Sequence, residues 1–518
     1  MSHAVSRSST LSASAIAKAI FDVEAALDLE DPVWVQDDVH WWPLYRLEIY
    51  RLLFASQATG GSAASKQSWR QQLGPAGKAP TVSAATAPPG CIWLVSDGLS
   101  WSRLGDRDVE RFCTPLQQWC DNLDVRSVII DRASATLRLG QPVGHWWAPA
   151  MHRRKIAAAL LTRLRPNPQH AELVRRVELA AARAGSSLPA LSARRFDTMA
   201  RAVLLMADLL HDRIKVEQVR SVFLVSFYDV SGYAFTLAAA RAGVRCVDVQ
   251  HGVTGPHHLA YTLWPELQHF RPGWRLLPTH FWSWSSADAE LINSWGKHSQ
   301  PPRHAIHGGH PFLQAWATGS MSLPTDMQTR LDRLLSAAQG RQRVLVTLQP
   351  GLTHVEALAP LIQAWKLRPE VSWWLRLHPM ALAEGPTIQA LARAHALASF
   401  DIETATALPL PALLAQAHVH ATHSSSTVIE AQTVGLTSVV WSGYGAELAQ
   451  DQLASGAASV ALDGASLVDA LARAPHPPHL KPVDAQAITK APSHPNAGGD
   501  NQQAQGPTAL RRLLEMNP

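Results

Sequence analysis

Three short segments, far apart in the chain, carry the side chains best suited to bind a ligand and act on it. They are Gln250-His251-Gly252, Arg376-Leu377-His378-Pro379, and Thr422-His423-Ser424-Ser425-Ser426 followed by Glu430. Each segment ends an apolar, β-like run, which is where an α/β protein binds its ligands. Together they supply imidazoles, hydroxyls and a carboxylate. These groups can hold a nucleotide-activated sugar and move its sugar, so we expect the three segments to form one site.

The serine run is the first part of this expected site. Ser424, Ser425 and Ser426 lie where a strand gives way to a helix, and serine is a strong N-cap residue. The free N–H groups at a helix N-terminus attract phosphate. Glu430 follows inside the same helix, where its carboxylate can accept hydrogen bonds from sugar or ribose hydroxyls. Helix capping alone also explains a serine run, and that alternative stays open.

His378 ends a strand that also contains Arg376. Because Pro379 keeps His378 out of the α region, the imidazole is expected to project from the strand end. There it can donate to a phosphate oxygen as a leaving nucleotide gains charge. We therefore expect a donor-nucleotide site made by Arg376, His378, Thr422, Ser424, Ser425, Ser426 and Glu430.

Two residues compete for the role of catalytic base. His251 has the side chain best tuned to take a proton near neutral pH, and Gly252 permits a tight turn or close ligand approach. Asp97 ends an earlier strand, although turn formation alone explains an Asp-Gly pair. The loop around His251 supplies further candidates for binding an acceptor: Gln250, Gly252, His258 and Tyr261.

Several other chemistries lack support. The His-rich loop has no acidic or cysteine partner that would complete a metal set, so we expect no metal. Asp106 and Asp108 are interpreted as acidic residues preceding a helix. The phosphate-loop and dinucleotide-binding glycine motifs are both missing from the sequence, so a nucleotide-sugar co-substrate is expected and no other cofactor. Trp282 and Trp284 are candidates to stack on a sugar or base.

Composition narrows the class of protein. A chain of 518 residues is long enough for two domains with extensions. Its 46 basic residues face 41 acidic ones with no long block of one sign, which argues against nucleic acid as a partner. The four cysteines are expected to be buried free thiols. The N-terminus lacks a signal-peptide pattern and no apolar run is long enough to span a bilayer. We expect a cytoplasmic protein, with peripheral attachment to the inner membrane left open.

Alternation of apolar runs and helical patterns predicts the fold. Strands are expected at 91–95, 125–130, 221–226, 244–249, 344–348, 372–377, 419–422 and 438–441, with helices between them. This order predicts an α/β protein of two Rossmann-like parallel-sheet domains whose strand ends face one cleft. We expect a helical N-terminal extension and linker over 1–90, an acceptor-side domain over 91–316, a less ordered connection over 317–341, a nucleotide-sugar-binding domain over 342–474 and a flexible tail over 475–518.

The chain resembles GT-B-type bacterial surface-polysaccharide glycosyltransferases, and especially the capsule and lipopolysaccharide biosynthesis proteins that carry a Gln-His-Gly loop. The resemblance covers most of residues 40 to 460. More distantly, the chain is similar to bacterial sialyltransferases, capsular Kdo transferases and CDP-glycerol glycerophosphotransferases. The segments that carry the resemblance are Trp42-Pro43-Leu44-Tyr45-Arg46, Val95-Ser96-Asp97-Gly98, Val247-Asp248-Val249-Gln250-His251-Gly252-Val253, Thr347-Leu348-Gln349, Arg376-Leu377-His378-Pro379 and Thr422-His423-Ser424-Ser425-Ser426.

This resemblance implies a metal-independent glycosyltransferase. It would move a sugar from a CMP-linked or other nucleotide-linked donor to a growing capsule or lipopolysaccharide glycan, free or lipid-linked. The sialyltransferases imply an acidic base, for which this chain offers Asp97, whereas the glycerophosphotransferases favour His251. The basic segment that those enzymes use on membranes is not evident in the sequence. Two alternatives stay open: a UDP-sugar 2-epimerase-like enzyme, and a non-catalytic component of glycan assembly.

Overall fold

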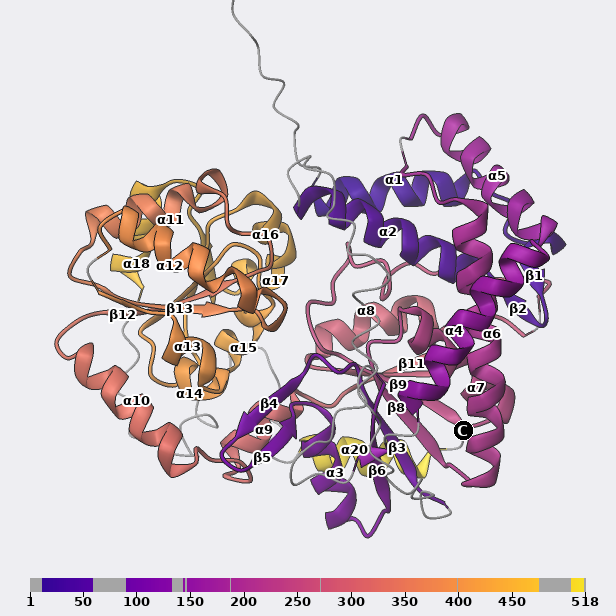
Figure 1. Ribbon diagram of the computed structural model, residues 1–518, viewed down its shortest axis with the longest axis horizontal. Helices are drawn as coiled ribbons and strands as arrows, with labels where there is room; N and C mark the ends of the chain where they lie inside the picture. Colours follow the sequence, from indigo (N-terminus) through magenta and orange to yellow (C-terminus); the bar gives the residue numbers. More distant parts are fainter. Residues whose placement is uncertain are drawn as a thin grey trace, which may run out of the picture. The chain divides into compact units, whose positions relative to one another are not determined.

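The computed structural model describes residues 12–58, 90–132, 143–144, 147–186, 188–270, 272–397, 399–474 and 505–516. These residues form two compact units (Figure 1). Unit 1 contains the described residues up to Trp101, from Val109 to Pro311, and from Gln505 onward. Unit 2 contains Ser102–Asp108 and the described residues from Phe312 to 474. The expected linker and tail fall mostly on 59–89 and 475–504, which lie outside the described residues.

Seven parallel strands form the main sheet of unit 1, in the order β11-β10-β9-β8-β3-β6-β7. Numbered along the chain, this order is 7-6-5-4-1-2-3. The sheet is doubly wound, because successive strands are added in one direction from β3 to β7 and in the opposite direction from β8 to β11. The point where the order reverses lies between β3 and β8. Nearly all the residues of these central strands are buried, as a parallel sheet covered on both faces requires. The strands are β3 (Ile92–Ser96), β6 (Ser127–Asp131), β7 (Val143–Gly144), β8 (Ser221–Val225), β9 (Arg245–Val249), β10 (His280–Ser283) and β11 (His304–His307).

The N-terminal segment is helical, as expected, and its helices pack into the core of unit 1. Trp34, Trp41 and Trp42 are buried in the same apolar cluster as Trp93 of β3. Burial of these large rings explains why the segment packs on the sheet. This segment contains α1 (Ala13–Ala25), the 3-10 turn η1 (Pro32–Trp34), the two-stranded ribbon β1 (Val35–Gln36) and β2 (Val39–His40), and α2 (Trp42–Ala58).

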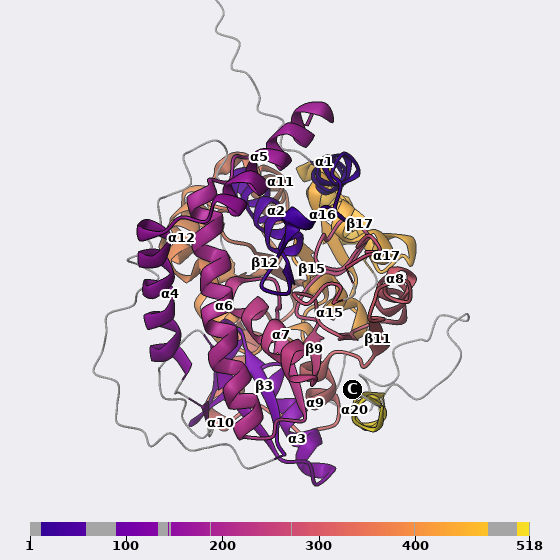
Figure 2. The same ribbon diagram turned by 90° about the vertical axis from the view of Figure 1, so that its right-hand side faces the viewer.

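The other helices of unit 1 follow the expected alternation. Helix α4 packs on α6, which packs on α7 (Figures 1 and 2). The last helix, α20, lies against β11, and the Met516 carbonyl accepts a hydrogen bond from Arg245. The helices are α3 (Cys113–Asn122), α4 (Trp147–Leu164), α5 (Pro168–Arg183), α6 (Ala193–Val216), α7 (Val230–Ala242), α8 (Ser286–Gly296) and α20 (Gln505–Glu515).

Residues 101–110 form a hairpin where the sequence predicted the approach to a helix. Strands β4 (Trp101–Leu104) and β5 (Arg107–Glu110) pair across a turn in which Gly105 has a φ of 62°. Asp106 therefore lies in the turn and Asp108 in a strand, not at a helix N-terminus. Trp282, expected as a stacking platform, lies in β10, and a Cβ on Gly308 would come within 2.0 Å of its buried ring. Its role is packing.

Unit 2 contains a six-stranded parallel sheet in the order β14-β13-β12-β15-β16-β17. Numbered along unit 2, this order is 3-2-1-4-5-6, the Rossmann arrangement, which reverses between β12 and β15. The strands are β12 (Arg343–Leu348), β13 (Ser372–Leu377), β14 (Phe400–Asp401), β15 (Val419–Thr422), β16 (Ser438–Val440) and β17 (Ala458–Val460).

Helices cover both faces of this second sheet (Figure 1). The expected less ordered connection over 317–341 is wrong, because Thr325–Ala337 forms helix α10 with Leu331 and Leu334 buried. The helices are α9 (Pro311–Ala317), α10, α11 (Val355–Leu367), the 3-10 helix η2 (Pro379–Glu384), α12 (Gly385–Ala394), α13 (Glu403–Ala407), α14 (Leu410–Leu414), α15 (Thr427–Thr433), α16 (Gly443–Leu448), α17 (Gln450–Ala454) and α18 (Gly464–Arg473).

The expected fold class, α/β with two Rossmann-like parallel-sheet domains, is confirmed by these two sheets. That the strand ends of the two domains face one cleft stays a prediction. The four cysteines are buried free thiols, as expected. Within the described residues, no helix is both long and apolar enough to cross a bilayer.

Candidate functional site

In unit 1, polar side chains gather beyond the carboxyl ends of the strands on either side of the sheet reversal. Asp97 follows β3, Tyr228 follows β8, and His251 follows β9. The chain leaves β8 through Ser226, a non-glycine residue with a φ of 61°. Such left-handed backbone is costly for serine and is often found at functional sites. Neighbouring parallel strands thus bring together residues that are up to 154 positions apart in the sequence.

His251 is held by Tyr228, which the sequence analysis did not identify. The Tyr228 hydroxyl lies 3.0 Å from Nε2 of His251, and the two ring centroids are 5.6 Å apart. The other ring nitrogen, Nδ1, is buried. Nε2 is therefore occupied by Tyr228, and Nδ1 is shielded from solvent without a hydrogen-bond partner among the described residues.

The charges around His251 include the other candidate base. Burial lowers the pKa of His251, and the Asp97 carboxylate opposes this by favouring the protonated ring. Arg132 and Arg111 lower the pKa further. The imidazole is accordingly neutral at pH 7. The mutual influence of His251 and Asp97 shows that the structure places the two candidate bases in one electrostatic neighbourhood.

Asp97 is half-buried, and one of its oxygens is committed to the backbone. Its Oδ1 accepts hydrogen bonds from Leu99 N at 2.8 Å and Ser100 N at 3.2 Å, as an Asp-Gly turn favours. The structure gives Oδ2 no such bond within the described residues. The turn and a catalytic role are therefore compatible, since they use different oxygens.

A second carboxylate, Glu110, lies close enough to Asp97 for their charges to interact, and the sequence analysis missed it. Glu110 is fully buried and accepts hydrogen bonds from Phe112 N at 2.8 Å, from Cys113 N and from Ser96 Oγ at 3.3 Å. Burial, aided by the charge of Asp97, raises the pKa of Glu110 to about 7. In the sequence, Glu110 was visible only as an acidic residue within a segment predicted to be helical. The pair therefore includes one carboxyl group, Glu110, that gains or loses a proton near neutral pH.

The remaining loop candidates have structural roles in unit 1. Gln250 is buried, accepting from Trp284 N at 2.6 Å and donating to Asp288 at 3.2 Å, so it braces the loop. Tyr261 donates to Asp248 at 2.9 Å. Burial lowers the pKa of His258 to about 3, which makes it a neutral packing residue. These contacts give the three residues structural roles, and acceptor binding by them stays a prediction.

Gly252 does not need to be a glycine for its backbone conformation. Its φ lies outside the left-handed region, and a Cβ added there would meet nothing within 4 Å. The expected tight turn stays a prediction, and the backbone conformation found here does not require glycine. The open space beside it leaves close approach of a ligand as a prediction.

In unit 2, a second polar cluster lies at the reversal between β12 and β15. The Gln349 side chain, just beyond β12, donates to Thr422 Oγ1 at 3.4 Å and accepts from Ser424 N at 3.3 Å. Thr422 Oγ1 donates to Thr347 O at 2.9 Å and accepts from Ser425 N at 3.1 Å. These bonds fix the start of the serine run on the sheet edge. Gln349 lay in a resembling segment but was not proposed as a site residue.

The serine run lies at the start of helix α15, as expected, but it does not cap the helix through a side chain. Ser426 takes the N-cap position of α15, but its side chain makes no capping bond. Ser425 Oγ instead accepts from Thr427 N at 3.2 Å and donates to Thr427 Oγ1 at 3.0 Å. Because α15 has only seven residues, its dipole adds little, and the hydroxyls and amides of the loop are the groups offered to a ligand.

The remaining donor-site candidates, His378, Arg376 and Glu430, differ in burial and in their contacts. His378 is exposed at the end of β13, next to β12, and its Nδ1 accepts from Met380 N at 3.1 Å. The Arg376 guanidinium binds the carbonyl oxygens of Ala405, Thr406 and Leu408, which gives it a local structural role. Glu430 is 5% exposed and lies near His420. Of these three, His378 is the one presented to solvent.

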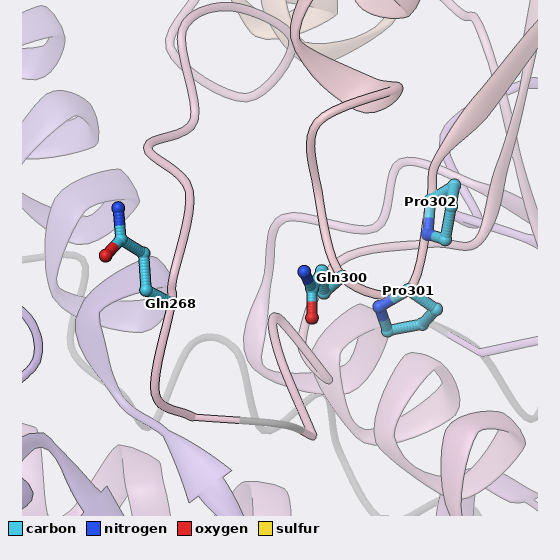
Figure 3. A pocket seen from close by; sticks show the side chains of 4 residues that line it. All are labelled: Gln268, Gln300, Pro301 and Pro302. Carbon is cyan, nitrogen blue, oxygen red and sulfur yellow. The ribbon is translucent and has the colours of Figure 1, made fainter.

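A surface hollow elsewhere in unit 1 offers little chemistry. It has a volume of about 560 Å³ and is lined by Gln268, Gln300, Pro301 and Pro302 (Figure 3). It lies on the side where β11 begins, opposite the strand ends described above, and its lining has no titratable side chain. Among the described residues, no group of three or more His, Cys, Asp or Glu side chains could hold a metal ion.

Comparison with known proteins gives similar structures only. Neither a protein-family model nor a curated protein sequence matches the chain. A UDP-GlcNAc 2-epimerase from Neisseria meningitidis bound to UDP-GlcNAc is similar at a TM-score of 0.46 and 11% identity, covering 82% of this chain and 99% of that one. The Methanocaldococcus jannaschii UDP-GlcNAc 2-epimerase with UDP-GlcNAc and UDP scores 0.47 at 9% identity, covering 82% and 98%. A glycotransferase of kitacinnamycin scores 0.40 at 13% identity, covering 82% and 98%.

TM-scores and sequence identities this low do not identify the reaction. The chemistry of the side chains in the two clusters is the basis for a proposed function.

Proposed function

We propose that this chain is an enzyme that moves a sugar from a nucleotide-activated donor to a hydroxyl group of a growing bacterial surface glycan. One observation carries the proposal: each of its two doubly wound sheets has a polar cluster at its reversal point, which is where such sheets bind ligands. The two clusters differ in chemistry. The cluster in unit 2 is neutral and rich in hydrogen-bonding groups, whereas the cluster in unit 1 is ionisable.

The neutral cluster suits the nucleotide part of the donor. The amide of Gln349 and the half-buried hydroxyls of Ser424 and Ser425 can bond ribose hydroxyls and phosphate oxygens. The exposed imidazole of His378 can donate to the phosphate as the nucleotide leaves. Donor binding therefore needs no charged clamp in this proposal, and Arg376 is left to its structural role.

In the ionisable cluster, we assign the base role to Asp97. Its Oδ2 can take the proton of the acceptor hydroxyl, while Nε2 of His251 is bonded to Tyr228 and its Nδ1 is buried. The acceptor oxygen then bonds to the anomeric carbon, the bond from that carbon to the phosphate oxygen breaks, and the nucleotide leaves with the electron pair. His251 orients and supports the site as a neutral ring.

A second candidate, epimerisation at carbon 2 of a UDP-linked sugar, is favoured by the Asp97 and Glu110 pair. One group must accept the proton from carbon 2 while the electron pair forms a carbon–carbon double bond and the nucleotide leaves carbon 1. A second group must then donate a proton to the opposite face of carbon 2 as the nucleotide adds back to carbon 1. Asp97 and Glu110, whose pKa burial raises to about 7, are the two carboxyl groups offered for these roles. This pair was not apparent in the sequence, where the epimerase alternative lacked a set of carboxylates.

A thermal-shift screen of CMP-, CDP-, UDP- and GDP-linked sugars tests nucleotide binding, since a ligand of the folded state raises the melting temperature. The sugar nucleotide that binds is then incubated with and without a glycan acceptor. Transfer only with acceptor, lost by about 10²-fold or more in Asp97→Asn, supports the first proposal. An epimer formed without acceptor supports the second. If no sugar nucleotide binds, both proposals fail and a non-catalytic role in glycan assembly is favoured.

A further inference from the structure

Helix α4 exposes an apolar stripe that nothing among the described residues covers. Ile156, Leu160 and Leu164 are 45%, 55% and 75% exposed. They are four residues apart, so they lie one above another on the same side of the helix. The opposite side, with Met151, Ala158 and Thr162, is buried and packs toward α6. We call the exposed side, defined by Ile156, Leu160 and Leu164, the outer face of α4.

The outer face is flanked by cations without acidic partners. Arg153 is seven residues before Leu160 and Arg163 three after it, which places both beside the stripe. Arg153, Arg163 and Arg165 are exposed and form no ion pair within the described part of the chain. From residue 132 to residue 171 the sequence contains seven arginines and lysines and no aspartate or glutamate.

We propose that the outer face of α4 binds an anionic lipid membrane surface. A helix that joins aliphatic side chains with arginines on one exposed side can insert the former among acyl chains while the latter meet lipid phosphates. The stripe is aliphatic and has no exposed aromatic residue, whereas protein-binding surfaces are typically anchored by aromatic side chains. The helix contains four charged residues in 18, so it can lie on a bilayer but not cross it.

The position of α4 connects this surface to the ionisable cluster of unit 1. Lys155, on the same helix, has a charge close enough to lower the pKa of Asp229, which follows Tyr228 at the end of β8. Attachment of the protein to a membrane through this helix would suit a lipid-linked glycan acceptor. Membrane binding itself does not rest on the proposed reaction.

The test is flotation of the full-length protein with lipid vesicles at low ionic strength. Vesicles of phosphatidylcholine are compared with vesicles that also contain phosphatidylglycerol. We expect binding to the anionic vesicles only. Leu160→Gln with Leu164→Gln should weaken it by roughly tenfold or more, and Arg153→Gln with Arg163→Gln by roughly fivefold for each arginine. Leu367→Gln is the matched control, because Leu367 is 58% exposed at the end of a helix in unit 2.

Three results would overturn the proposal. The first is failure of the wild-type protein to bind anionic vesicles, and the second is equal loss of binding in the Leu367→Gln control. The third is a dimer, seen by sedimentation, that Leu160→Gln with Leu164→Gln abolishes without any vesicle binding by wild type, since the face would then bind a second copy. Nucleotide-induced thermal shifts should be the same in all these variants, so failure here is distinct from failure of the proposed reaction.

Discussion

Tyr228 and His251 form a hydrogen-bonded pair, with 3.0 Å between the phenol oxygen and Nε2. The two residues come from loops that follow adjacent parallel strands, β8 and β9. His251 is therefore fixed by a neighbour 23 positions away and not by its own loop alone. The left-handed backbone at Ser226 gives the chain the turn that precedes Tyr228.

Replacing Tyr228 with phenylalanine should lower turnover by about tenfold and leave nucleotide binding unchanged. The substitution keeps the ring contact and removes the hydroxyl that orients His251. A double-mutant cycle with His251→Asn checks the coupling, because residues that act through one another give non-additive effects. If the two substitutions reduce turnover independently, Tyr228 does not position His251.

Glu110→Gln should change how stability depends on pH. In the wild-type protein the unfolded state loses this proton near the ordinary pKa of 4.5, whereas the folded state keeps it to about 7. The folded state thus binds more protons, so its stability falls as pH rises from about 4.5 to about 7. The Glu110→Gln variant has no titrating group at this position, so it lacks this fall in stability. Its stability relative to wild type should rise across that interval by a few kcal/mol at most, of the order of 1.36 kcal/mol per unit of pKa shift.

Urea unfolding of both proteins at several pH values between 4.5 and 8 measures this difference. Other titrating groups contribute equally to both proteins and cancel. A difference in stability that stays flat with pH would show that burial does not raise the pKa of Glu110.

Thr422→Val should destabilise unit 2 by about 1–3 kcal/mol and weaken nucleotide binding. Valine has the shape of threonine and suits the strand, but it leaves Thr347 O and Ser425 N without the Oγ1 partner they have in the wild type. Thr433→Val is the control, because Thr433 is exposed and should change stability by less than about 0.5 kcal/mol. Equal effects in both variants, measured by urea unfolding, would contradict the role given to Thr422.

His420 should make the folded chain sensitive to acid. Its ring is fully buried between Thr347 Oγ1 at 2.8 Å and Ser438 Oγ at 2.9 Å, and burial lowers its pKa to about 3. Below pH 6.5 the histidine binds a proton in the unfolded state, whereas in the folded state it stays neutral. The free energy of unfolding therefore falls as pH drops from 6.5 toward 3.

His420→Gln removes that contribution, which amounts to about 1.4 kcal/mol per pH unit for one proton. Urea unfolding at pH 7, 6 and 5 should give a shallower decline for the variant than for wild type. His258 and His280, whose pKa values burial also lowers to about 3, should preserve part of the slope. Identical slopes would exclude a buried neutral His420.

The sequence by itself determined the strand and helix alternation and therefore both parallel sheets. Buried parallel strands are continuous apolar runs, and residues such as His251, His378 and Thr422 follow or end those runs. Their places at the strand ends could thus be predicted from local pattern alone. The local sequence pattern did not predict short or irregular elements, such as strand β10 or the hairpin at 101–110.

Only the tertiary structure decided which residues share a site and in what state of charge. Strand order sets the neighbours of each loop, so Tyr228 next to His251 and Gln349 next to Thr422 follow from pairing between strands distant in sequence. Burial then sets ionisation, which made Glu110 a titrating group and left His251 neutral. Desolvation and long-range pairing depend on the whole packed domain, and for that reason no single motif contained them.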